Sequence, residues 1–303
     1  MDNNRKTVIA LGFFDGVHLG HQALMKQALE RARQLDMRAT VFTFDRSPRE
    51  FVTGQAVPLL TTAEERCRLI DQLFGIKDVI VAPFDNEMMT MPWEDFIHLL
   101  VDKYHAGALV AGHDYRFGHK NIGTAALLAE KAAELGLVCD IIPPVTLQGT
   151  LVSATHIRTL LEQGDMDAAR AFLGHPFTLS GSILHGAGLG RQIGAPTVNL
   201  VPPYHQLIPP HGVYATRVLV DGEPLPAVTN VGMRPTLDDK RGLTVESHIL
   251  DRSLHLYGRT CRVEFLHMMR PERRFASLEE LQAQIALDVA QTREYFQNTE
   301  QAL

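Results

Sequence analysis

The stretch GFFDGVHLGH, residues 12–21, follows directly on the apolar run TVIAL at residues 7–11. A short run that is continuously apolar is typical of a buried strand, and the segment that starts near His21 has helical character. Glycines in the stretch allow the backbone to come close to a ligand. The sequence therefore predicts a strand, a ligand-binding loop and a helix, the first unit of a doubly wound α/β sheet.

The same alternation of strand and helix continues to about Ile142. Helices are predicted at residues 61–75 and 124–136, because each has a threonine at its start and a glycine at its end. Strands that alternate with helices imply right-handed crossovers, so we expect an N-terminal parallel sheet of the Rossmann-like kind with helices on both faces. Apolar runs predict its strands at residues 7–14, 39–44, 78–84, 108–112 and 137–142.

The chain after about residue 175 is rich in glycine and proline and then in β-forming residues. Asp221-Gly222 between two such runs is a strong hairpin signal, and further strands are expected at residues 242–251 and 259–269. We predict a small antiparallel β-barrel, with a sandwich as the alternative. A terminal helix should begin at a capping box of Ser277 and Glu280 and dock through an apolar stripe. That stripe consists of Leu278, Leu281, Ile285 and Val289.

These patterns divide the chain into two predicted domains, residues 1–175 and 176–303. Two short helices, broken at Gly164 and Gly174, are expected to lead from the first to the second.

Composition limits the partners of the protein. The chain has 303 residues, a net charge of -6 and 45% hydrophobic residues, as in an ordinary soluble globular protein. The acidic balance argues against nucleic acid and membrane surfaces as partners, so we expect small-molecule ligands and a monomer or weak oligomer. Three widely separated cysteines suggest a reducing compartment. The apolar run near the start is too short for a membrane span, and we expect a cytoplasmic protein.

The two histidines in GFFDGVHLGH are the first candidate functional residues. Ligands of doubly wound sheets bind outside the carboxyl ends of the strands, where His18 and His21 are expected to lie. Imidazoles there could hydrogen-bond phosphate oxygens during attack on phosphorus. The alternative is that they are inert loop residues.

The stretch resembles the signature of the nucleotidylyltransferase superfamily, and its longer form FDGVHLGHQ is similar to that of the prokaryotic bifunctional riboflavin kinase/FAD synthetase family. Further stretches resemble motifs of the same family, in the same order along nearly the whole chain. They are FTFDRSPREF at 42–51, AGHDYRFG at 111–118, VSATHIR at 152–158, GAPTVN at 194–199, NVGMRPT at 230–236 and VESHILD at 245–251.

The resemblance implies a first site that transfers AMP from ATP to FMN. His18 and His21 would contact the ATP phosphates, and Arg158 would hold the leaving pyrophosphate. Other residues implied in nucleotide or phosphate binding are Gly12, Phe14, Asp15, Gly20, Ser153 and Thr155. Residues implied in flavin binding are Phe44, Asp45, Asp114, Arg116 and Arg234. The chain departs from the family at Ala154, where a hydroxyl residue is usual, and at residues 46–48, where RSP replaces PHP.

The resemblance also implies a second site that phosphorylates riboflavin with ATP and Mg²⁺. Thr197 and Asn199 would bind the ion, since their alternation on a strand puts both on one face, and Glu246 would receive or orient the proton of the ribityl hydroxyl. The phosphate cradle would be formed by Gly186, Gly188, Gly190 and Gly194.

Two other functions remain open from the sequence. Another H-x-G-H transferase, such as a cytidylyltransferase, would leave the C-terminal half unexplained. A flavin-binding sensor, or a kinase-only protein with an impaired adenylyltransferase site, has Ala154 as its support.

Overall fold

The computed structural model describes residues 5–184, 197–233, 242–252 and 259–300. The chain forms two compact units, Met1–Ala154 and Thr155–Leu303. Within the described residues no helix combines the length and apolar character needed to cross a bilayer.

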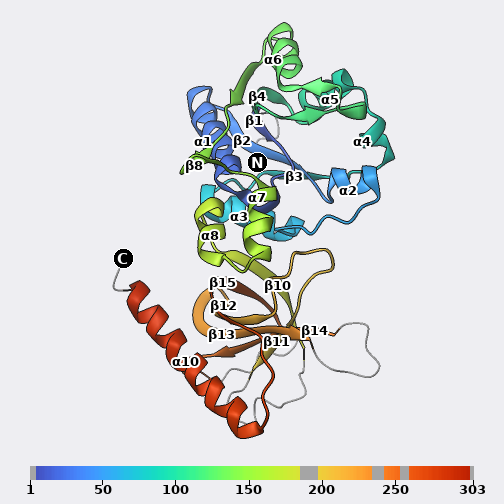
Figure 1. Ribbon diagram of the computed structural model, residues 1–303. Coiled ribbons are helices and arrows are strands. Elements are labelled where there is room, and N and C mark those ends of the chain that lie inside the picture. The colour runs from blue at the N-terminus through green and yellow to red at the C-terminus, as the bar shows by residue number, and fades with distance from the viewer. Residues whose placement is uncertain (1–4, 185–196, 234–241, 253–258, 301–303) are drawn as a thin grey trace. The chain divides into compact units, whose positions relative to one another are not determined.

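The first unit is built on a five-stranded sheet in which all neighbouring strands are parallel. The strand order is β3-β2-β1-β4-β7, and helices flank the sheet (Figure 1). All five predicted strands are present, so this part of the predicted fold is confirmed. The strands are β1 (Thr7–Leu11), β2 (Arg38–Phe44), β3 (Val79–Ala82), β4 (Ala106–Gly112) and β7 (Val138–Ile142).

The segments between these strands contain the helices and a few short elements. The predicted helices are observed as α3 (Ala63–Phe74) and α6 (Ala125–Glu134). Thr62 caps α3 by accepting from the main-chain N–H of Glu65, and Gly75 ends it in a left-handed conformation. The remaining elements are η1 (Asp15–Val17), α1 (Leu19–Gln34), α2 (Pro48–Thr53), α4 (Asn86–Thr90), α5 (Trp93–Asp102), β5 (Arg116–Phe117), η2 (His119–Asn121), β6 (Gly123–Thr124), β8 (Thr146–Leu147) and β9 (Thr150–Leu151).

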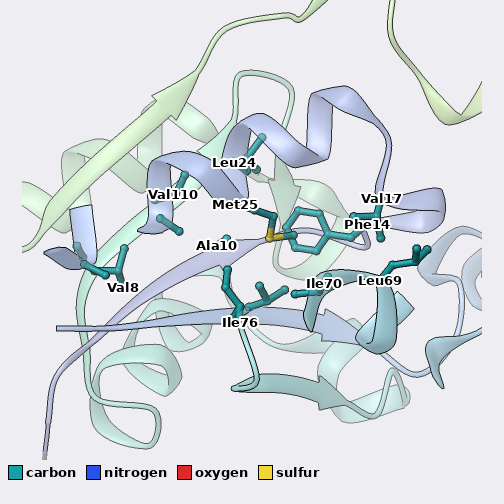
Figure 2. Packing of buried hydrophobic residues seen from close by; sticks show 14 residues of the cluster. Val8, Ala10, Phe14, Val17, Leu24, Met25, Leu69, Ile70, Ile76 and Val110 are labelled. Carbon is teal, nitrogen blue, oxygen red and sulfur yellow. The ribbon is translucent and has the colours of Figure 1, made fainter. Parts of the chain in front are cut away.

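A hydrophobic core lies on each face of this sheet. One joins the sheet to α1 and α3 and includes Phe14 and Val17 from the loop after β1 (Figure 2). The other joins the sheet to α5 and α6 through Phe96, Leu100 and Leu128. Since Phe14 belongs to a core, the loop that carries the two histidines is fixed to the body of the domain.

The second unit contains a closed antiparallel barrel with the strand order β10-β11-β14-β13-β12-β15, so the barrel prediction is confirmed. Asp221 and Gly222, both at positive φ, form the predicted two-residue hairpin turn. The strands are β10 (Phe177–Leu184), β11 (Val198–Val201), β12 (Gly212–Val220), β13 (Glu223–Met233), β14 (Leu243–Ile249) and β15 (Thr260–Pro271). The helices are α7 (Ala154–Glu162), α8 (Met166–Leu173) and α10 (Leu278–Glu300).

The unit boundary, between Ala154 and Thr155, precedes the predicted domain boundary at residue 175. The difference concerns α7 and α8, which the sequence analysis assigned to the first domain. Helix α8 packs on β10 and β15 and buries Met166, Ala169 and Leu173. These apolar contacts attach α8 to the barrel, within the second unit.

Helix α10 packs on β12 and β13, but the predicted stripe is wrong at its first member, because Leu278 is 51% exposed. The buried residues of the helix include Asp288, Thr292 and Phe296. Both carboxylate oxygens of Asp288 accept from Arg270 on β15, at 2.9 and 2.7 Å. A buried ion pair therefore contributes to docking beside the apolar contacts.

We expect Asp288→Ala to destabilise the second unit by about 3–5 kcal/mol, because it leaves the charge of Arg270 without its partner. Thermal unfolding followed by circular dichroism measures the loss. Glu294→Ala, on an exposed part of the same helix, is the control and should change stability by less than about 0.5 kcal/mol. The single tryptophan, Trp93, lies in the first unit, so its unfolding signal should not move. A stability loss equal to that of the control would contradict the prediction.

Candidate active sites

The loop after β1 is shaped by close packing around Phe14. Phe14 has a positive φ of 57° and is 1% exposed. A Cβ at Gly12 would lie 2.8 Å from the Phe14 ring, so only glycine leaves room there. The chain then enters α1, whose N-cap is His18. The Nδ1 atom of His18 accepts from the main-chain N–H of His21 at 3.3 Å.

The two histidine rings are stacked, with centroids 3.5 Å apart and planes 16° apart. His18 is buried, and the rings of Phe14 and His21 pack edge to face. Burial first, then the neighbouring His18 and the cation of Arg66, hold the pKa of His21 well below its usual 6.5. His21 is therefore neutral at pH 7. Its buried Nδ1 has no hydrogen-bond partner among the described residues, which leaves a polar atom for a ligand.

The lowered pKa of His21 predicts an acid-sensitive first unit. As pH falls below 6.5, His21 becomes protonated in the unfolded chain but stays neutral in the folded protein. The free energy of unfolding therefore decreases below that pH, by about 1.4 kcal/mol per pH unit. His21→Asn should remove this part of the loss. Unfolding monitored by Trp93 fluorescence at pH 7.5 and 5.5 checks it; identical losses in both proteins would refute it.

The histidines line a cavity of about 420 Å³, here called the histidine cavity. Its walls come from the loop after β1, the segment after β4 and residues 142–145 and 151–154. Of the sequence-predicted residues it brings together Gly12, Phe14, His18, Gly20, His21, Phe44, Asp114, Arg116 and Ser153.

A second cavity of about 530 Å³, here called the aromatic cavity, shares Phe44, Pro48, Tyr115 and Arg116 with the first. Rings and methionine side chains dominate its lining, which suits a flat aromatic ligand. Sequence reasoning missed most of these residues, because they come from separate segments without a common motif. They include Val52, Phe84, Met88, Met89, Met91 and Phe96.

Asp15 and Asp45 do not line the two described cavities, and their contacts with a ligand stay predictions. Asp15 is 3% exposed, and its Oδ1 accepts from the main-chain N–H groups of Leu60 and Thr61 at 2.9 and 3.0 Å. The Oδ1 of Asp45 accepts from the N–H of Phe84 at 2.9 Å. Both carboxylates thus help to fix the loops around the cavities.

Ser153 immediately precedes α7, as predicted for a residue that starts a helix. Ala154, its first residue, also lines the histidine cavity. Thr155 and Arg158 follow in α7 within the second unit, and their contact with phosphates stays a prediction.

The candidate site of the barrel is a row of polar side chains across three strands. Glu246 on β14 lies directly opposite Asn199 on β11 and Asn230 on β13. Their strand neighbours, such as Val245 and Ser247, are buried, so the row lies on the outer face of the barrel. Sequence reasoning missed Asn230, whose place follows from strand register.

Thr197 lies one residue before β11, and its place on the same side as Asn199 stays a prediction. A hydroxyl, an amide oxygen and a carboxylate are hard donors that fit Mg²⁺ when substrate phosphates complete its coordination. No cluster of three His, Cys, Asp or Glu residues suited to a metal occurs in the described part of the chain. The predicted Gly186, Gly188, Gly190, Gly194 and Arg234 lie outside the described residues.

Comparisons with known proteins show the class of proteins to which the chain is similar. A family model described as FAD synthetase matches residues 1–156, and one described as riboflavin kinase matches residues 173–296. The fold and the two sites thus define a two-module transferase of flavin chemistry.

Two relatives and a solved structure are similar to this chain over nearly its full length. The bifunctional riboflavin kinase/FMN adenylyltransferase of Escherichia coli K12 is 39% identical and covers 97% of this chain and 94% of its own. That of Bacillus subtilis is 32% identical, over 98% and 95%. A crystal structure reported as a macrolide-efflux protein from Streptococcus pneumoniae has a TM-score of 0.84 and 30% identity, over 95% of this chain and 94% of that one. The chain belongs to the bifunctional riboflavin kinase/FMN adenylyltransferase family.

Proposed function

We propose that the second unit phosphorylates riboflavin to FMN and that the first unit adenylylates FMN to FAD, each with ATP. The family membership supports both steps. The observation that carries the proposal is the shared wall of the two cavities. FAD joins an adenine nucleotide to a flavin, and adjoining sites for these halves suit its formation.

In the adenylyl transfer, a phosphate oxygen of FMN attacks the α-phosphorus of ATP. The new P–O bond forms as the bond to the β-phosphate bridge breaks, and pyrophosphate leaves. His18 and His21 act by hydrogen bonds to the crowded, anionic transition state. Because His21 is neutral at pH 7, its role is to donate a hydrogen bond and not to supply charge. Arg158 would receive the pyrophosphate.

The aromatic cavity is the proposed site of the flavin ring. Phe44, Phe84 and Tyr115 provide ring surfaces, and apolar walls favour a flat heterocycle. Arg116 and Asp114, near the shared wall, are placed toward the phosphate of FMN in this proposal.

In the phosphorylation of riboflavin, Glu246 orients or receives the proton of the terminal ribityl hydroxyl, whose oxygen attacks the γ-phosphorus of ATP. Asn199 and Thr197 would hold Mg²⁺, which when bound neutralises phosphate charge. Asn230, beside Glu246, would help to orient the carboxylate.

We further propose a cytoplasmic location, small-molecule partners without nucleic acid or membrane, and a monomeric or weakly oligomeric state. The cysteines, Cys67, Cys139 and Cys261, are all free, which supports a reducing compartment.

A time course of riboflavin with the full-length protein, ATP and Mg²⁺ tests the function, with FMN and FAD resolved by chromatography. FMN should rise first and then convert to FAD. FMN without FAD would indicate a kinase-only protein, and flavin retention without either product would indicate a sensor.

Ala154→Ser should accelerate adenylyl transfer from FMN by up to roughly tenfold, because one added hydrogen bond to phosphate is worth about 0.5–1.5 kcal/mol. Initial rates of FAD formation check this. Ala154→Val, which adds bulk without a hydroxyl, is the matched control and should not accelerate the reaction. Equal rates for the serine variant and the wild type would contradict the expectation.

A further inference from the structure

Arg66, in helix α3, is a buried arginine that reaches the carboxyl ends of two strands. It is 1% exposed. Its Nη1 donates to the carbonyl oxygen of Phe13 at 2.5 Å, and its Nη2 donates to that of Phe44 at 2.7 Å. The guanidinium also lies 4.5 Å from the centre of the Phe13 ring. Phe13 lines the histidine cavity and Phe44 lines both cavities, so this one side chain supports the walls of both.

These contacts do not neutralise the charge of Arg66, because carbonyl oxygens carry no formal charge. Burial lowers the pKa of Arg66, but a guanidinium starts so far above neutrality that it stays charged. Asp15 and Asp45 act on it electrostatically, but each also binds main-chain N–H groups. The positive charge of Arg66 acts on His21, since it helps to lower the pKa of that imidazole. A fixed cation in a poorly screened environment therefore lies behind the wall of the histidine cavity.

The adenylyl transfer needs such a charge. The triphosphate of ATP is strongly anionic, and attack by the phosphate of FMN brings more negative charge to the α-phosphorus. His21, neutral at pH 7, offers only hydrogen bonds. A cation that is already in place costs no reorganisation during the reaction.

We infer that Arg66 is a positioning residue of adenylyl transfer: without touching substrate, it supplies fixed positive charge behind the histidine cavity and holds Phe13 and Phe44 in place. This inference rests on the proposed function of the first unit. In this arrangement the two histidines form hydrogen bonds to the phosphates, and Arg66 provides the positive charge.

The test uses the full-length protein and FAD formation from supplied FMN and ATP. Inhibition constants are measured for two inhibitors: tripolyphosphate, which is strongly anionic, and adenosine, which is uncharged. Arg66→Met should raise the constant for tripolyphosphate at least tenfold and leave that for adenosine within threefold. Arg66→Lys, which keeps a cation, should rescue most of the loss. Lys77→Met, which removes an exposed cation just after the same helix, is the control and should change neither constant more than twofold.

Three results would overturn the inference. The first is that Arg66→Met leaves both inhibition constants unchanged. The second is that it raises both equally, as a collapsed cavity would. The third is that Arg66→Lys raises the constant for tripolyphosphate as much as Arg66→Met does. If Trp93 fluorescence shows that the methionine variant does not fold, Arg66→Lys decides alone: it should stay within threefold for tripolyphosphate, and a tenfold rise would refute the inference. Failure of the wild type to form FAD would instead count against the proposed function.

Discussion

FAD formation from FMN is expected to fall about 100- to 1,000-fold in His21→Asn, the range seen when one preorganised donor to a developing negative charge is removed. The substitution acts on a ring that is stacked on His18 and lines the histidine cavity. It leaves the cap of α1 in place, because that cap uses the main-chain N–H of His21 and the side chain of His18. Initial rates at saturating FMN and ATP measure the loss.

Two controls make the His21 result specific. His98→Asn removes an exposed imidazole of the same unit and should change the rate less than twofold. Phosphorylation of riboflavin by the His21→Asn protein should stay within twofold of the wild type, because that site lies in the barrel. If FAD formation survives at more than a tenth of the wild-type rate, His21 is not a principal contact of the transition state.

The reciprocal loss is expected at Glu246. Glu246→Gln should lower riboflavin phosphorylation about 100- to 10,000-fold, the usual contribution of general acid–base catalysis. Glutamine keeps the size and polarity of the side chain between Asn199 and Asn230 but cannot take up the hydroxyl proton. The rate of FMN formation from riboflavin, with product FMN and FAD summed, is the measurement.

The control for Glu246 is again internal. The Glu246→Gln protein, given FMN and ATP, should form FAD within twofold of the wild-type rate. Glu264→Gln, which changes a glutamate on β15, a barrel strand that does not pair with β14, should leave phosphorylation nearly unchanged. A Glu246→Gln protein that phosphorylates riboflavin at a tenth of the wild-type rate or better would show that the carboxylate is not the base.

The two folds could be predicted because their signals are local. Buried parallel strands read as continuous apolar runs, and Asp221-Gly222 matches the backbone of a tight hairpin. The docking of α10 was predicted less well. The apolar stripe indicated the amphipathic face, but the ion pair of Asp288 with Arg270 joins residues 18 positions apart in a way that no periodicity reveals.

The residues of the candidate sites could likewise be predicted where their signal is local, and not where distant segments come together. His18 and His21 could be found because they share one loop with its glycines. The aromatic cavity could not, since its lining comes from residues 44–53, 84–96 and 115–121, which only the folded chain brings together. Asp15 lies inside the motif, but the motif did not reveal that its carboxylate accepts from a loop 45 residues away. Arg66 was missed because a buried arginine in a capped helix looks like any other helical arginine.

Closure of the barrel has a consequence for the precision of phosphorylation. Side chains of a strand alternate between two faces, so a shift of β14 by one residue would turn Glu246 inward and Val245 outward. In an open sheet an outer strand could slip alone. Here β14 is held by β11 on one side and β13 on the other, and a slip would have to break both ladders. The closed ring of strands thus fixes the direction in which the Glu246 carboxylate points.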